Sequence, residues 1–273
     1  MKFALTATPI PVQSAPILLC GPVEKAFEVA ARYGYDGVEL HLRDRGNVDV
    51  ATVQKQMKTK GLPVTTLGTG IAAVEYGINF AHPEAGIRKK AVEHVKALIE
   101  LAGELGSAVT IGSFNGKAGK GEDREARRKA AIECVGQCAA AAEKAGVTIL
   151  YEPLNRYEND YLNNVADGLE VLDQLGAANV KLLCDTYHMN IEEVDFVEAL
   201  KRAGDRLGYV HLVDSNRCGP GMGHLPIGEI MVGLSEMAYE GYLSFECLPV
   251  PDGETVALES IGYVKKLLDK CTE

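Results

Sequence analysis

Two hydrophobic patterns alternate along the chain: short apolar runs, and longer stretches with an apolar residue at every third or fourth position. The short runs predict buried strands at 2–8, 37–43, 62–67, 108–111, 148–151, 181–184, 207–210 and 242–245. The longer stretches predict helices at 23–33, 50–60, 82–106, 122–144, 165–175, 192–203, 226–240 and 255–270. The pattern therefore predicts eight consecutive strand–helix units without an internal linker.

Alternation of strands and helices predicts a parallel sheet, either closed into a barrel or open and doubly wound. An open sheet usually carries a glycine-rich phosphate turn after its first strand, whereas here the first strand is followed by TPIPVQS. The length of 273 residues also fits one (β/α)₈ barrel, which typically takes about 250 residues. We therefore expect an α/β protein with a single TIM-barrel domain over residues 1–273.

Four apolar runs in the second half end in side chains that can bind a metal ion. These side chains are Glu152, Asp185, His211 and Glu246, and the gaps between them are 33, 26 and 35 residues. Each gap is close to the roughly 30 residues of one strand-plus-helix unit. Any one of them alone would be read as a solvated acid or a core histidine. Together, they are expected to converge at one end of the barrel.

Three carboxylates and one imidazole form a ligand set suited to Mn²⁺, Co²⁺ or Mg²⁺. The sequence therefore predicts a metal site of Glu152, Asp185, His211 and Glu246. Two glutamates that face each other across a substrate can remove and return a proton at one carbon, and Glu152 and Glu246 are the candidates. The ion would hold two substrate oxygens and stabilise the enediolate between them. This chemistry is proton transfer beside a carbonyl.

Composition and charge narrow the classes of partner. A formal net charge of −10 opposes binding to the phosphate backbone of nucleic acids. The N-terminal MKFALTATPIPVQ has only a short apolar run before Thr and Pro, so it does not predict a signal peptide, and no membrane partner is expected. The seven cysteines form no C-x-x-C pair, which favours reduced thiols in a cytoplasmic protein.

Four segments of the second half closely resemble the ketose 3-epimerases among the xylose-isomerase-like sugar isomerase and epimerase barrels. They are YEPLNRYENDYLNN at 151–164, LLCDTYHMNIEE at 182–193, VHLVDSNRCGPGMGH at 210–224 and FECLP at 245–249. GTG at 68–70 and HPEAGIRKKAVEHV at 82–95 extend the resemblance into the first half. It implies a xylose-isomerase-like TIM barrel and an isomerase of carbohydrate metabolism that inverts C3 of a free ketose or keto-sugar acid.

The resemblance also implies roles for individual residues. The four strand-end side chains would hold a divalent ion, most often Mn²⁺ and otherwise Co²⁺ or Mg²⁺, with Glu152 and Glu246 as the acid–base pair. Glu158, His188 and Arg217 would contact the sugar substrate. A homo-oligomer, either a dimer or a tetramer, is expected by analogy with barrels of this kind.

The sequence departs from the family where the distal end of the sugar is usually read. The first strand ends in TATPIP without the aromatic residues of many D-tagatose and D-psicose epimerases. The LTATPIP and GTG features are more similar to the branch that includes 5-keto-gluconate epimerases. Lys117, Lys120 and Arg217 are candidates to meet the carboxylate of such a substrate.

Two further features near the predicted strand ends are candidate binding groups. His41 and Glu39 share one face of the second predicted strand, and His41 is expected either to reach the pocket or to pack. His224 and the glycines 219, 221 and 223 could form an anion nest for a substrate phosphate, but glycine-rich turns are common, so this is the minority interpretation.

Three other functions compete with the epimerase. An aldose–ketose or hydroxypyruvate isomerase would use the same metal and glutamates. An abasic-site nuclease would need several metals and a basic groove, which the single ligand set and the net charge of −10 oppose. A non-catalytic sugar-binding protein would leave the acid–base pair without a purpose.

Overall fold

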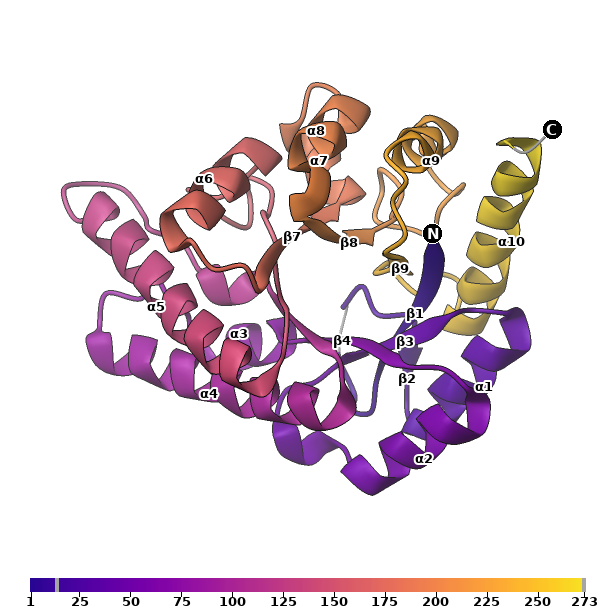
Figure 1. Cartoon of the computed structure of the whole chain (residues 1–273), viewed down its shortest axis with the longest axis horizontal. Helices are drawn as coiled ribbons and strands as arrows, with labels where there is room; N and C mark the ends of the chain where they lie inside the picture. The colour runs from indigo at the N-terminus through magenta and orange to yellow at the C-terminus, as the bar shows by residue number, and fades with distance from the viewer. Residues whose placement is uncertain (13–14, 272–273) are drawn as a thin grey trace.

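The computed structural model of the chain describes residues 1–12 and 15–271, with side chains through residue 268. Within this part, eight parallel strands form a ring that is surrounded by helices (Figure 1). The strands follow one another in chain order, and the pairing of the first with the last closes the barrel. They are β1 (Lys2–Thr8), β3 (Gly37–His41), β4 (Val64–Gly68), β5 (Ala108–Ile111), β6 (Ile149–Tyr151), β7 (Val180–Asp185), β8 (Leu207–His211) and β9 (Tyr242–Phe245). The predicted TIM barrel is confirmed.

Eight helices follow the strands on the outside of the ring. They are α1 (Val23–Tyr33), α2 (Val50–Lys60), α4 (Ala85–Leu105), α5 (Arg124–Ala145), α6 (Val165–Leu175), α8 (Phe196–Ala203), α9 (Ile227–Glu236) and α10 (Gly253–Cys271). The sequence places most of their ends well. Gly34 and Gly61 end α1 and α2 with φ of 74° and 67°, a backbone conformation that glycine adopts without strain.

Short elements that the hydrophobic pattern does not predict are added at the strand ends. They are β2 (Leu19–Cys20), α3 (Gly70–Tyr76), α7 (Thr186–Glu192) and the 3₁₀ turns η1 (Arg45–Asn47), η2 (Ser113–Asn115) and η3 (Gly204–Arg206). Each is too short to show a helical or strand period. β2 pairs with the end of β1 and α7 follows β7 directly, so both lie beside the site described below.

Two differences between predicted and observed helix boundaries have a clear physical cause. The helix expected from residue 82 begins at Ala85, because Pro83 disfavours helical backbone at His82 and the guanidinium of Arg88 binds the carbonyls of both residues. The helix expected at 192–203 is broken, since Glu193 has extended backbone and Asp195 caps α8 through the N–H of Glu198.

The interior of the barrel is filled beneath the strand ends. Leu150, Leu183 and Tyr209 form a small buried cluster inside the ring, and the Tyr209 hydroxyl lies 2.8 Å from Oγ1 of Thr65. Two residues further along β8, the ring of His211 meets the edge of the Tyr209 ring at a centroid distance of 5.8 Å. Packed side chains therefore support His211 from below.

Two global properties complete the fold. No helix among the described residues is both long and apolar enough to cross a membrane. Six cysteines with described side chains are free thiols: Cys20, Cys134, Cys138, Cys184, Cys218 and Cys247.

Candidate metal and acid–base site

The register of the barrel brings the four predicted side chains to one rim. Asp185 and His211 are the last residues of β7 and β8 and lie opposite each other in the ladder. Glu152 comes directly after β6, and Glu246 directly after β9. Because all of these strands are parallel, their carboxyl ends face the same way. The expected convergence is confirmed.

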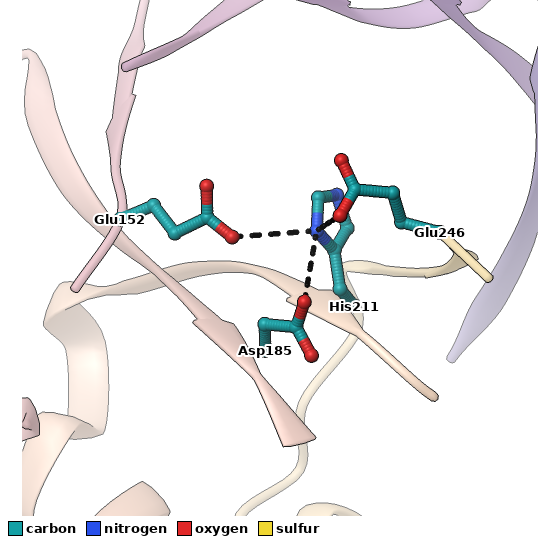
Figure 2. A group of neighbouring side chains, drawn as sticks. All are labelled: Glu152, Asp185, His211 and Glu246. Atoms are coloured by element: carbon teal, nitrogen blue, oxygen red, sulfur yellow. Dashed lines mark ion pairs between the residues drawn. The ribbon is translucent and has the colours of Figure 1, made fainter. Parts of the chain in front are cut away.

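The four side chains meet around one nitrogen atom. Nδ1 of His211 lies 3.6 Å from Oε1 of Glu152, 3.9 Å from Oδ2 of Asp185 and 3.7 Å from Oε2 of Glu246. All four potential ligand atoms lie within 4.8 Å of one another. Figure 2 shows Glu152 and Glu246 approaching from opposite sides, with His211 between them. The two candidate proton carriers therefore flank the centre of the cluster.

Burial and like charges shape the protonation of this cluster. Burial raises the pKa of Asp185 to about 8, with a contribution from the neighbouring Glu246 and Glu152, and burial also raises the pKa of Glu152. Burial opposes a charge on His211, but the carboxylates of Glu39, Glu246 and Glu152 outweigh it and raise the pKa of His211 well above its usual value. The carboxyl groups gathered around Nδ1 of His211 therefore favour a bound cation at the centre of the cluster.

Several atoms of the cluster are buried without a hydrogen-bond partner in the described structure. They are Oε1 of Glu152, Oδ2 of Asp185 and Nδ1 of His211. Buried polar atoms are normally satisfied, and these three all face the same point. One divalent cation would satisfy all of them at once, so the residues present fit a metal ion with oxygen and imidazole ligands.

The carboxylate of Glu152 is packed against the backbone of β5's end. A Cβ atom at Gly112 would fall 2.2 Å from Oε2 of Glu152, closer than real atoms approach. Only glycine leaves the carboxylate its observed place. Gly112 is a site residue that the sequence analysis missed, because a lone glycine after a strand gives no signal of its own.

Arg217 and His41 lie on the other side, next to Glu246. Nη2 of Arg217 is 3.4 Å from Oε2 of Glu246, and Nη1 is 3.3 Å from Oε1 of Glu158. Nε2 of His41 is 3.9 Å from Oε1 of Glu246. Glu246 therefore has two cationic or hydrogen-bonding neighbours, and Glu158 is joined to it through one arginine.

The backbone of Arg217 is held in an unusual conformation. Its φ of 61° lies in the left-handed region that non-glycine residues rarely adopt. The N–H of Arg217 donates to the carbonyl of Asp214, its carbonyl accepts from the N–H of Leu248, and its guanidinium lies 4.9 Å from the ring centre of Tyr187. Such conformations concentrate at functional sites, where the surrounding contacts hold them.

His188 lies on α7 with its ring buried beside Asp185. Its Nδ1 accepts hydrogen bonds from the backbone N–H of Asn155 and from the Asn155 amide at 2.7 Å. Burial lowers the pKa of His188 well below its usual value, so the ring is neutral and its proton sits on Nε2. That Nε2 has no partner in the described structure and lies 3.8 Å from Oδ2 of Asp185, so it can donate to a ligand.

Through Glu246, the cluster borders a cavity of about 530 Å³. Its polar wall includes His41, Glu158, Arg217 and Glu246, which places these residues where a bound molecule would meet them. The opposite wall is largely apolar and consists of Pro11, Val12, Ala15, Pro16, Ile17, Ile71 and Val74, with Glu75 and Ser113 beside them. A small polar molecule would have one end at the cluster and the other against this apolar wall.

A larger hollow of about 780 Å³ opens at the other end of the barrel, where the strands begin. Thr65, Leu150 and Tyr209 line it, and none of the cluster residues reaches it. The ligand cluster and the larger hollow thus lie at opposite ends of the barrel. The candidate site is therefore the smaller cavity, which Glu246 of the cluster lines.

The basic loop after β5 does not serve the cavity as expected. Nζ of Lys117 donates to the carbonyl of Tyr157 at 2.6 Å, and Asp160 accepts from the backbone N–H groups of Ala118 and Gly119. Of the three cations expected near a substrate carboxylate, Arg217 lines the cavity and Lys117 and Lys120 do not. Asp160, from the segment after β6, holds this loop in place.

The expected anion nest after β8 is already filled. The carboxylate of Asp214 is almost fully buried and accepts from the backbone N–H groups of Ser215, Gly221 and Leu225. His224 pairs instead with the Ser215 hydroxyl at 2.9 Å. A phosphate at this turn would meet the Asp214 charge, which opposes the minority interpretation of a phosphate nest.

Comparisons with known proteins agree with this geometry. The family model described as xylose isomerase-like TIM barrel matches residues 27–267. The L-ribulose 3-epimerase of Methylomonas sp. (strain DH-1) is 34% identical over 227 residues, which cover 81% of this chain and 77% of that protein. The 3-dehydro-D-guloside 4-epimerase of Escherichia coli K12 is 27% identical over 228 residues, 81% of this chain and 85% of that protein.

Solved structures give the same relationship. The crystal structure of a D-allulose 3-epimerase from Methylomonas sp. in complex with D-allulose matches with a TM-score of 0.81 and 25% identity, covering 97% of this chain and 99% of that one. The resemblance found in the sequence motifs is thus confirmed over nearly the whole chain. The chain belongs to the xylose isomerase-like TIM barrel family, and within it to the sugar epimerases.

Proposed function

We propose that the protein is a metal-dependent ketose 3-epimerase whose single divalent ion is held by Glu152, Asp185, His211 and Glu246, with Mn²⁺ as the first candidate. The observation that carries the proposal is the pair of glutamates on opposite sides of a buried ligand cluster that borders the cavity. When bound, the ion supplies Lewis-acid stabilisation of the negative charge that develops on the substrate oxygens.

The two glutamates perform the proton transfer. One carboxylate removes the proton from C3, and the other delivers a proton to the opposite face of the same carbon, which inverts its configuration. Burial raises the pKa of Glu152, which suits a group that must be protonated in one half of the reaction. Arg217 lies 3.4 Å from that second carboxylate and donates a hydrogen bond to it.

Three residues bind and orient the sugar. The neutral His188 donates from Nε2, which has no protein partner within the described residues. Arg217 offers a cation and Glu158 an acceptor on the same wall of the cavity. Since these groups surround the cluster, they meet the carbons next to the reacting centre and hold C3 between the two glutamates.

The distal wall favours a neutral substrate. Its surface is mostly apolar, the carboxylate of Glu75 is already paired with Arg43 at 2.8 Å, and Arg217 is already paired with Glu158 and Glu246. A carboxylate or phosphate on the far end of the sugar would be desolvated near Glu75 without a free cation among the described lining residues. We therefore propose a free ketose as the substrate.

A panel of substrates tests this proposal. With the same divalent ion, kcat/KM for neutral ketoses such as D-psicose and L-ribulose should exceed kcat/KM for 5-keto-gluconate by at least about tenfold, or about 1.4 kcal/mol. A preference for the keto-acid in the unaltered protein would contradict the proposal.

A further inference from the structure

Glu39 is a fully buried carboxylate that is neither a member of the ligand cluster nor part of the cavity wall. It lies on β3, across the barrel from β8, and its Oε1 is 3.2 Å from Nε2 of His211. Its Oε2 is 3.3 Å from the same nitrogen. Both oxygens therefore face the ring nitrogen of His211 that points away from the cluster.

A carboxylate at this depth is costly for folding. Removing a charge from water is unfavourable, and an apolar residue of similar volume often gives equal or greater stability. The fold alone therefore gives no reason for an acid at this position. The contacts of Glu39 give such a reason, because one of them is with His211, the histidine at the centre of the ligand cluster.

The contact decides which nitrogen of His211 faces the cluster. With Nε2 donating its proton to Glu39, the other nitrogen, Nδ1, faces Glu152, Asp185 and Glu246 at 3.6 to 3.9 Å. A metal-binding histidine commonly donates its second N–H to a carboxylate, which fixes the ring and keeps its lone pair on the ligand side. The geometry has the same form here.

We propose that Glu39 is a positioning residue that holds the His211 ring by its Nε2–H, so that Nδ1 presents its lone pair to the divalent ion. This inference rests on the metal site of the proposed function. It assigns Glu39 no contact with substrate or ion. It predicts that the loss of Glu39 weakens metal binding while the remaining ligands stay in place.

Glu39 has a second contact, which the test must separate from the first. Nε2 of His41 also lies 3.2 Å from Oε1 of Glu39. The His41 ring packs on the backbone of Gly68, where a Cβ atom would fall 2.4 Å from Nδ1 of His41. A change at Glu39 could therefore act through either histidine, and a variant of His41 distinguishes the two routes.

The experiment measures Mn²⁺ and Co²⁺ affinity by competition with a fluorescent chelator, together with the melting temperature of each metal-free protein. Glu39→Leu removes the acceptor, whereas Glu39→Gln removes the charge and keeps an oxygen that accepts from Nε2–H. His41→Gln keeps Glu39 and His211 intact. Glu100→Gln removes one negative charge at an exposed position far from these contacts.

Glu39→Leu should weaken affinity roughly 10- to 100-fold, the usual effect of losing the carboxylate behind a metal-binding histidine. Glu39→Gln and His41→Gln should each lose less than Glu39→Leu, and Glu100→Gln should bind like the unaltered protein. The metal-free melting temperature of Glu39→Leu should not fall, so the loss cannot be ascribed to folding.

Three results would overturn the inference while leaving the metal site in place. Unchanged affinity in both Glu39 variants would remove the positioning role, and equal losses in the two would reduce it to charge alone. An equal loss in His41→Gln would move the role to His41. If the unaltered protein bound neither ion, the metal site itself would fail, and the proposed function would fall with this inference.

Discussion

Glutamine in place of Glu152 or Glu246 should lower kcat by at least about 10²–10⁴-fold, the usual contribution of acid–base catalysis alone. Each change removes a group that carries a proton and also weakens a ligand at 3.6 or 3.7 Å from Nδ1 of His211. The loss should therefore exceed that of a simple acid–base residue. Steady-state kinetics and the metal content of each purified variant measure the two effects separately.

The matched control is Glu158→Gln, which makes the same substitution in the same cavity but outside the ligand cluster. It should retain metal at the level of the unaltered protein and change KM more than kcat. If Glu152→Gln or Glu246→Gln turned over substrate within about tenfold of the unaltered rate, the assignment of the acid–base pair would be wrong.

Removal of divalent ions with a chelator should abolish turnover, and Mn²⁺ or Co²⁺ should restore it. The buried atoms of Glu152, Asp185 and His211 have no partner within the described structure, and an ion is the partner that fits all of them. The same titration should raise the melting temperature by mass action, because the ion binds only the folded cluster.

Full turnover in a preparation verified to be free of metal would contradict this account. The control is Asp185→Asn, which replaces a ligand that takes no part in the proposed proton transfer. It should lower the affinity for Mn²⁺, so that a higher concentration of the ion is needed to restore activity. Restoration at the same concentration as in the unaltered protein would remove Asp185 from the ligand set.

The ligand cluster could be predicted from sequence because two simple periods fix it. Strands alternate their side chains, and each strand–helix unit repeats after roughly 30 residues, so an acid directly after each buried run must reach the same rim. Asp185 opposite His211 in the β7–β8 ladder is the direct consequence. No knowledge of side-chain contacts was needed.

The contact between Glu39 and His211 could not be predicted in this way. The two residues are 172 positions apart and lie on strands that are not neighbours in the sheet. Alternation on β3 indicated only that Glu39 and His41 share a face. Whether Glu39 or His41 reaches the cavity depends on the tilt of the strands and on the space above Gly68. The sequence pattern gives no information on either the tilt or this space.

The two candidate anion-binding features that do not serve the cavity have a common physical cause. A glycine-rich turn and a basic loop both suggest a ligand, but backbone N–H groups bind whichever acceptor lies nearest. Here Asp214 fills the turn after β8 and Asp160 fills the loop after β5. Both acids are ordinary loop residues in the sequence, and only the folded chain shows what they bind.

The carbon that exchanges its proton tests the central claim most directly. Turnover of a ketose in D₂O, followed by NMR of the product, should place deuterium at C3 and leave C1 unlabelled. One glutamate removes the C3 proton, and the other, whose carboxyl proton has exchanged with solvent, delivers a deuteron. A variant that keeps one working glutamate and its metal should exchange C3 of one epimer without inverting it. Deuterium at C1 or C2 but not at C3, with a substrate that is turned over well, would contradict the epimerase and favour an aldose–ketose isomerase.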